Sequence, residues 1–167
     1  MNQTGLGRAG LNPMKKRAAE PEDAENIARL VNDAFRPERF FIDQDRTNPE
    51  KVHDLLQKGK FLLAEEAGAL VGCVYVEKRG ERGYFGLLAV DPARQKAGWG
   101  SFLIAAAEED CRAAGCRVMD LTIVNLRQEL PGYYRRLGYE ENGTLPFPAD
   151  QLSKIPCHLV RMSKPLG

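Results

Sequence analysis

The most informative stretch of this chain is Leu87-Leu88-Ala89-Val90-Asp91-Pro92-Ala93-Arg94-Gln95-Lys96-Ala97-Gly98-Trp99-Gly100-Ser101, in which an apolar strand ends at Asp91-Pro92 and a basic turn leads into a helix. Glycine lets the backbone approach a ligand closely, and the first amides of a helix have no partner within it. With the positive end of the helix dipole, these amides suit a phosphate or pyrophosphate, and Arg94 and Lys96 add positive charge. Glycine pairs are weak evidence alone, so an ordinary strand-to-helix turn remains the alternative.

Regular periodicities surround this stretch on both sides, with hydrophobic residues at helical or alternating spacing. The expected elements are a strand at 16–19, helices from 21 to about 36 and from 49 to 59, strands at 61–66, 70–78 and 84–90, a helix from 99 to 114, a strand at 118–124, a short helix within 127–137, and strands at 139–143 and 159–163. This order predicts an α/β or α+β fold, in which helices cover both faces of a mixed sheet.

The composition is that of an ordinary globular protein. Of 167 residues, 43% are hydrophobic and 28% are charged, and the net charge of +1 gives no reason to expect a nucleic-acid or membrane partner. No segment resembles a signal peptide or a membrane span, which favours the cytoplasm. The cysteines form no CxxC pair, so we expect free thiols and no metal site. We expect residues 1–14 to be a weakly ordered N-terminal extension and residues 15–167 to form one domain.

Two local motifs, in register with the order of elements, carry a family resemblance. The first is Gln95-Lys96-Ala97-Gly98-Trp99-Gly100, between a strand and a helix, and the second is Tyr133-Tyr134-Arg135-Arg136-Leu137-Gly138-Tyr139. They lie on either side of the strand at 118–124. From about Lys16 to Pro165 the chain resembles the GNAT superfamily of acetyl-CoA-dependent N-acetyltransferases. The resemblance implies a mixed, mostly antiparallel sheet of about six to seven strands, flanked by helices, with a splayed parallel pair that binds CoA.

The resemblance also implies where acetyl-CoA, the expected cosubstrate, would bind. Main-chain groups of Leu88, Ala89 and Val90 would pair with pantetheine, and the backbone from Gln95 to Ser101 would hold the pyrophosphate. The residues expected to bind the cosubstrate are Leu88, Ala89, Val90, Arg94, Gln95, Lys96, Ala97, Gly98, Trp99, Gly100, Ser101 and Asn125. Arg94 and Lys96 could equally be solvated turn residues, and Asn125 could be only a turn residue.

Catalysis is expected to involve a tyrosine and a main-chain amide. Tyr134 occupies the motif position of the acid that protonates the departing thiolate, with Tyr133 as the runner-up. A main-chain amide of Leu88 or Ala89 would stabilise the oxyanion of the tetrahedral intermediate. Alternatively, the two tyrosines only pack beneath the sheet.

The general base and the acceptor are not evident from the sequence. The strand at 84–90 contains no carboxylate, so Asp43 and Asp45 are the next candidates on the acceptor side, together with His158. The bulky segments 40–46 and 145–156 favour an enclosed pocket for a primary amine on a small molecule. The alternatives are acetylation of a protein N-terminus or lysine, and a non-catalytic acyl-CoA sensor. An edge strand near the C-terminus could support a homodimer.

Overall fold

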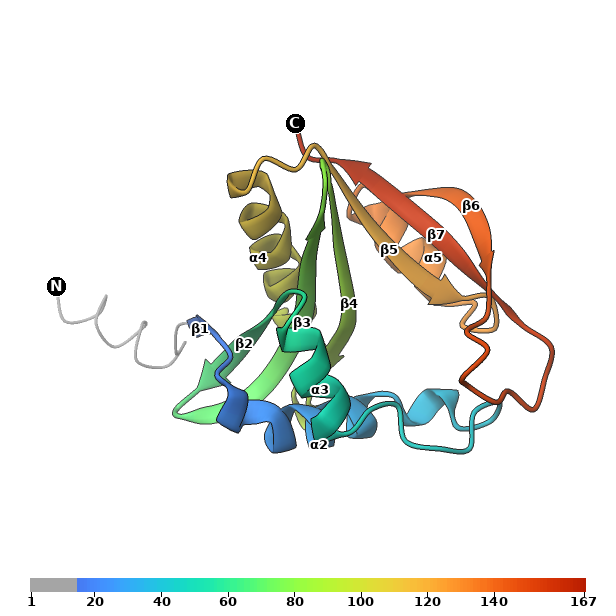
Figure 1. Cartoon of the computed structure of the whole chain (residues 1–167), viewed down its shortest axis with the longest axis horizontal. Helices are drawn as coiled ribbons and strands as arrows, with labels where there is room; N and C mark the ends of the chain where they lie inside the picture. The colour runs from blue at the N-terminus through green and yellow to red at the C-terminus, as the bar shows by residue number, and fades with distance from the viewer. Residues whose placement is uncertain (1–14) are drawn as a thin grey trace, which may run out of the picture.

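A seven-stranded sheet in the order β1-β2-β3-β4-β5-β7-β6 organises the computed structural model, which describes residues 15–167 (Figure 1). The strands are β1 (Lys15–Ala18), β2 (Lys60–Glu66), β3 (Ala69–Arg79), β4 (Arg82–Val90), β5 (Val118–Val124), β6 (Glu140–Pro146) and β7 (His158–Pro165). Every neighbouring pair is antiparallel except β4 and β5. The predicted fold class is therefore confirmed, including its single parallel pair. The expected N-terminal extension lies outside the described residues.

Helices cover both faces of the sheet, and each face has its own hydrophobic core. The helices are α2 (Ala24–Ala34), α3 (Pro49–Leu56), α4 (Trp99–Ala113) and α5 (Leu130–Arg136), with 3-10 turns η1 (Pro21–Asp23), η2 (Arg36–Glu38) and η3 (Pro92–Arg94). One core packs α4 and α5 against the sheet around Phe85 and Leu103, and the other packs α2 and α3 around Ile27 and Phe61. Figure 1 shows α4 on one side of β3 and β4, with α2 and α3 on the other.

Local sequence signals account for most of the element boundaries. The Asn48 side chain accepts a hydrogen bond from the amide of Lys51, which caps α3. Ala67 and Gly68 both have positive φ, as the tight turn between β2 and β3 requires. The first long helix ends at Ala34, two residues before the expected boundary, and η2 follows it.

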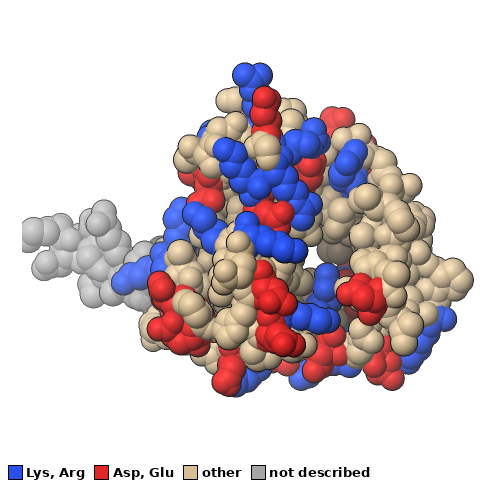
Figure 2. Space-filling model, in the orientation of Figure 1, with Lys and Arg blue, Asp and Glu red and all other residues tan. Residues whose placement is uncertain are grey.

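The parallel pair separates almost as soon as it forms. Its ladder contains only the pairs Arg82–Val118, Gly83–Met119 and Tyr84–Asp120, and the two strands then diverge (Figure 1). Beyond Tyr84, β4 therefore has no partner on this side among residues 15–167. Figure 2 shows the surface hollowed between the two halves, with acidic and basic side chains on the rim.

Several expectations concern the surface and the cysteines. The four cysteines are free thiols, as predicted, and three of them are buried. Within the described part of the chain, no helix has the length and apolar character needed to cross a lipid bilayer. The exposed strand β6 forms one edge of the sheet, and pairing with a second copy there remains a prediction.

Candidate functional site

A cleft of about 850 Å³ fills the space where β4 and β5 diverge. At one end it reaches the turn before α4, and at the other it reaches α2, η2 and the loop between β6 and β7. Its lining comprises Ala34, Phe35, Glu38, Ile42, Arg46, Tyr84–Leu88, Val90, Gln95, Lys96, Gly98–Ser101, Leu121–Val124, Arg127, Glu129, Leu130, Tyr133, Tyr134, Arg136, Phe147, Pro148, Gln151 and Leu159. One continuous space thus connects the two motifs found in the sequence.

A β-bulge shapes the β4 wall of this cleft. Tyr75 pairs with Gly86 and Cys73 with Ala89, so Leu87 and Leu88 together face the single residue Val74. Leu87 has a φ of +49°, a conformation that β-carbon sterics disfavour. Such bulges interrupt the ladder and redirect main-chain groups. Of the two expected amide donors, Leu88 lines the cleft, whereas the buried Ala89 does not.

The turn between β4 and α4 places main-chain amides at the other end of the cleft. Lys96 and Gly98 have φ values of +72° and +89°, and α4 begins at the next residue, Trp99. At Gly100, an added β-carbon would lie 3.0 Å from the Tyr133 hydroxyl, a tight contact that Tyr133 would have to relieve by a small shift. Of the residues predicted to hold the pyrophosphate, Gln95, Lys96 and residues 98–101 line the cleft, whereas Ala97 does not.

Two basic side chains at this end differ in their availability. Arg94 forms an ion pair with Glu66 of β2 and does not line the cleft. Lys96 lines the cleft and forms no ion pair with any described residue. Arg136, which was not among the predicted binding residues, also lines the cleft. Its spacing of three residues from Tyr133 on α5 could have indicated it, because residues i and i+3 share a helix face.

The two adjacent tyrosines occupy different places. The Tyr133 hydroxyl lies beside Gly100, near the start of α4. Tyr134 is buried next to Phe85 and Tyr139, at ring-centroid distances of 6.2 and 6.1 Å. Burial, with a smaller contribution from Tyr133, raises the pKa of the Tyr134 hydroxyl above its ordinary value. The hydroxyl is therefore protonated at neutral pH and can donate a hydrogen bond into the cleft.

The opposite end of the cleft contains a buried ion pair that the sequence analysis missed. The Glu38 carboxylate accepts a hydrogen bond from the Arg127 guanidinium at 3.0 Å, and both side chains are largely buried. Burial raises the pKa of Glu38, although Arg127 and Arg46 oppose this rise. Arg127 also binds Glu129 at 2.8 Å. Glu38 is thus a carboxylate in the cleft with a proton affinity higher than usual.

Two loops meet over this end. The amide of Lys154, in the loop between β6 and β7, donates a hydrogen bond of 2.7 Å to the carbonyl of Phe41. The Lys154 ammonium also forms an ion pair with the Asp43 carboxylate, at 3.5 Å. Figure 1 shows the segment after α2 extending along the bottom of the molecule to this loop. The two bulky segments noted in the sequence therefore contact each other, and both contribute side chains to this end of the cleft.

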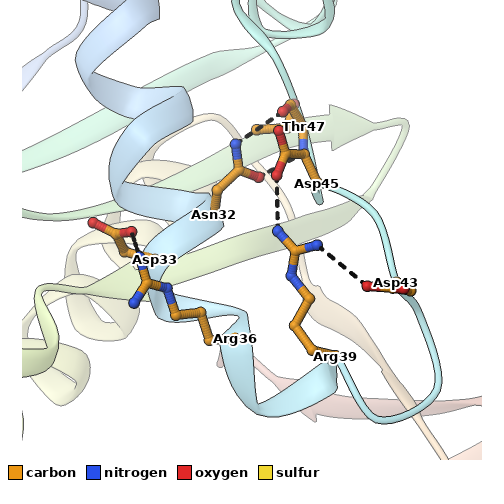
Figure 3. A network of polar contacts seen from close by, with 7 residues as sticks. All are labelled: Asn32, Asp33, Arg36, Arg39, Asp43, Asp45 and Thr47. Atoms are coloured by element: carbon orange, nitrogen blue, oxygen red, sulfur yellow. Dashed lines mark hydrogen bonds and ion pairs between the residues drawn. The ribbon is translucent and has the colours of Figure 1, made fainter.

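The expected acceptor-side residues lie elsewhere. Asp43 and Asp45 are 69% exposed, do not line the cleft, and both face Arg39 (Figure 3). His158 is exposed at the start of β7, and its amide donates to the Asn125 side chain at 2.8 Å. In this bond the side-chain oxygen of Asn125 is the acceptor, and the bond links the end of β5 to the start of β7. Neither His158 nor Asn125 lines the cleft. Within residues 15–167, no His, Cys, Asp and Glu side chains cluster in a way that suits a metal ion.

Comparison with known families agrees with this geometry. The profile of the Acetyltransferase (GNAT) family matches residues 24–139, which include both motifs and the diverging strands. The chain belongs to the GNAT family. A curated relative, Acetyltransferase YE1169 of Yersinia enterocolitica, is 33% identical over 85 residues, and the match covers 51% of this chain and 60% of that relative.

Solved structures with less than 25% identity share the GNAT fold of this chain. A protein described as a phosphinothricin N-acetyltransferase has a TM-score of 0.76 at 18% identity, covering 93% of this chain and 99% of its own. The ribosomal-protein-S18-alanine N-acetyltransferase from Escherichia coli has a TM-score of 0.72 at 13% identity, covering 93% and 95%. The yncA protein from Salmonella typhimurium, solved with its cofactor acetyl-CoA, has a TM-score of 0.67 at 20% identity, with the same coverage.

Proposed function

We propose that this protein transfers the acetyl group of acetyl-CoA to a primary amine on a small molecule. The observation that carries the proposal is the continuity of the cleft. A single cavity extends from the turn at residues 95–101, past Tyr134, to the charged end at Glu38 and Arg127. Two ligands that enter it from opposite ends would therefore meet between the diverging strands.

The residues present suit acetyl-CoA at the α4 end. The left-handed turn at Lys96 and Gly98 and the missing side chain at Gly100 let main-chain amides contact a pyrophosphate directly. Lys96 and Arg136 line this end and are unpaired within the described residues, so both are available to phosphate groups. The unpaired edge of β4 beyond Tyr84 suits the amides of pantetheine. The acetyl-CoA held by the yncA protein supports the same choice.

The chain then supplies the groups that acetyl transfer needs. Acetyl-CoA presents its acetyl group as a thioester, and attack by a neutral amine forms a C–N bond while the C–S bond breaks. The amide of Leu88, at the bulge, is the favoured donor to the carbonyl oxygen because Leu88 lines the cleft. Tyr134 presents a protonated hydroxyl that can donate to the departing sulfur. Glu38, the more buried of the two carboxylates that line the cleft, can take the proton of the amine.

The joined loops at the acceptor end favour a small molecule. The Lys154–Phe41 hydrogen bond links the two loops that contribute Ile42, Phe147 and Gln151 to the cleft wall, and such a link would restrict the size of the acceptor. A peptide acceptor is the second candidate, because the same two loops expose Phe40 and Leu152, at 54% and 77%. Exposed apolar side chains beside a site suit contacts with another chain.

Release of free CoA thiol, measured with a panel of amines and a panel of peptides, tests the proposal. We expect turnover with small primary amines and little turnover with peptides that present a free N-terminus or lysine. Turnover with peptides alone would favour the second candidate. Tight binding of acetyl-CoA in calorimetry, without turnover on either panel, would instead indicate an acyl-CoA sensor.

A further inference from the structure

One basic side chain at the acceptor end has no hydrogen-bonded or ion-paired anion among the described residues, although Arg46 does act electrostatically on Glu38. Arg46 lines the cleft and is half-buried, yet its guanidinium forms no ion pair and donates no hydrogen bond within residues 15–167. The nearby Glu38 carboxylate is already hydrogen-bonded to Arg127. The charged side chains that line this end are two guanidinium groups, Arg46 and Arg127, and two carboxylates, Glu38 and Glu129. Both carboxylates accept hydrogen bonds from Arg127, and neither is hydrogen-bonded to Arg46.

The protein holds the loop carrying Arg46 in place from both sides. Asn32 of α2 donates to the carbonyl of Thr47 at 3.1 Å and accepts from its amide at 3.0 Å. On the other side, Arg39 binds Asp45 at 2.8 Å (Figure 3). The guanidinium of Arg46 lies 5.3 Å from the centre of the Phe35 ring, which restricts its orientation. These contacts fix an unpaired cation at the wall of the cleft before any acceptor binds.

We propose that the acceptor is an amino carboxylate, whose carboxylate binds Arg46 while its amine lies in the same cavity as Glu38. This inference rests on the proposed function and specifies its acceptor. A guanidinium offers paired donors that match a carboxylate, and partial burial strengthens that contact. This carboxylate would supply the hydrogen-bonded anion that Arg46 does not find among residues 15–167. Lys96 and Arg136 lie near the turn before α4, where they are available to the phosphates of acetyl-CoA. Arg46 is therefore the arginine, unpaired within the described residues, that can bind the carboxylate of the acceptor.

Matched acceptors and variants of the full chain test the assignment. The standard L-amino acids and a series of ω-amino acids are compared with the corresponding amides, which keep the amine and lose the negative charge. The variants are Arg46→Gln and Arg46→Lys, and the control is Arg36→Gln, because Arg36 is exposed and pairs with Asp33 outside the cleft. For the best amino carboxylate, we expect Arg46→Gln to raise KM by roughly tenfold to a hundredfold, the effect of losing a charged hydrogen bond.

Arg46→Lys is expected to retain part of the affinity, and Arg36→Gln all of it. The KM for acetyl-CoA should stay unchanged in every variant. Thermal unfolding with and without the amino carboxylate, in the presence of CoA, provides a readout that does not depend on turnover. Wild-type protein should be stabilised and Arg46→Gln should not.

Three outcomes would overturn the assignment. They are amides that serve as well as their acids, an equal loss for acids and amides in Arg46→Gln, and equal stabilisation of Arg46→Gln and wild type. Failure of the proposed function looks different. The amino carboxylate would then bind and stabilise the wild type through Arg46, but no free CoA would form.

Discussion

The carboxylate of Glu38 and the guanidinium of Arg127 lie 3.0 Å apart at the acceptor end of the cleft, although 89 residues separate them in the chain. Glu38 belongs to η2, and Arg127 follows β5, so the pair links the two halves of the molecule that the diverging strands separate. Arg127 also influences the pKa of Tyr134, which places it in electrostatic reach of both groups. This arginine therefore lies between the proposed site of amine binding and the proposed site of thiolate departure.

Removal of the Glu38 carboxylate should change the pH dependence of the reaction. Glu38 accepts a proton only when ionised, and burial raises its pKa, so kcat/KM should rise with pH through a value above the usual glutamate range. Glu38→Gln should lower kcat/KM by roughly a hundredfold or more near neutral pH and abolish this rise. Asp33→Asn is the control, because Asp33 pairs with Arg36 outside the cleft. An unchanged pH profile in Glu38→Gln would assign the proton to water.

Removal of the Tyr134 hydroxyl should slow the chemical step and leave acetyl-CoA binding nearly unchanged. Tyr134→Phe keeps the ring against Phe85 and Tyr139 but removes the donor, so kcat should fall roughly tenfold to ten-thousandfold at saturating amine. Tyr133→Phe is the matched control, since the Tyr133 hydroxyl lies beside Gly100 near the start of α4. Steady-state kinetics of both variants provide the measurement. Similar small losses in the two variants would show that the pair serves only for packing.

A side chain at Gly98 should weaken acetyl-CoA binding by more than its effect on stability explains. Gly98→Ala and Gly115→Ala place alanine at nearly equal left-handed φ values, +89° and +92°, and each should lose roughly 1 kcal/mol of stability. Gly115 follows the far end of α4, where an added β-carbon meets open space. Calorimetry should therefore show reduced acetyl-CoA affinity for Gly98→Ala alone. Equal affinities would place the pyrophosphate elsewhere.

The buried carboxylate of Glu108 should make Lys164 important for stability. Lys164 lies 3.1 Å from Glu108, and the Tyr139 hydroxyl donates to the same carboxylate at 2.7 Å. Lys164→Met leaves that charge with one partner fewer, and we expect a loss of about 1–3 kcal/mol in urea unfolding. Lys60→Met is the control. Lys60 pairs with Asp110, which lies on α4 like Glu108, but this ion pair is exposed to solvent and should contribute under about 1 kcal/mol to stability. Equal losses of stability in the two variants would mean that the buried Glu108 carboxylate does not depend on Lys164 more than an exposed carboxylate depends on its partner.

The regular elements were predictable because each has a local cause. Alternating apolar residues define β5, Asn48 and Pro49 begin α3, and the glycines around Trp99 mark the start of α4. These signals depend on neighbours within a few residues, so they can be read from the sequence without knowledge of the tertiary structure. The divergence of β4 and β5 was expected only through the family resemblance, since nothing in either strand alone dictates it.

The acceptor end was not predictable in the same way. Asp43 and Asp45 stood out as carboxylates, but Arg39, a few residues earlier in the same segment, holds both on the outer face. Glu38 and Arg46 lie at the two ends of the same stretch, residues 38–46, and line the cavity instead. Irregular segments have no periodicity that indicates which side chains face inward. Only tertiary contacts, such as the Glu38–Arg127 pair, decide this.

The three residue pairs that join β4 to β5 leave a seam through the middle of the sheet. Amide hydrogens along this part of β4 exchange with water unless something else accepts them, whereas those in the paired strands are protected by the ladder. A thin, amide-bearing ligand lying in the seam would extend β4 as a non-peptide strand. The hydrogen-exchange pattern of the ligand-bound protein would then show one uninterrupted sheet. On this view, completion of the sheet recurs with every catalytic cycle, and the backbone at the seam alternates between solvent and cosubstrate as its partner.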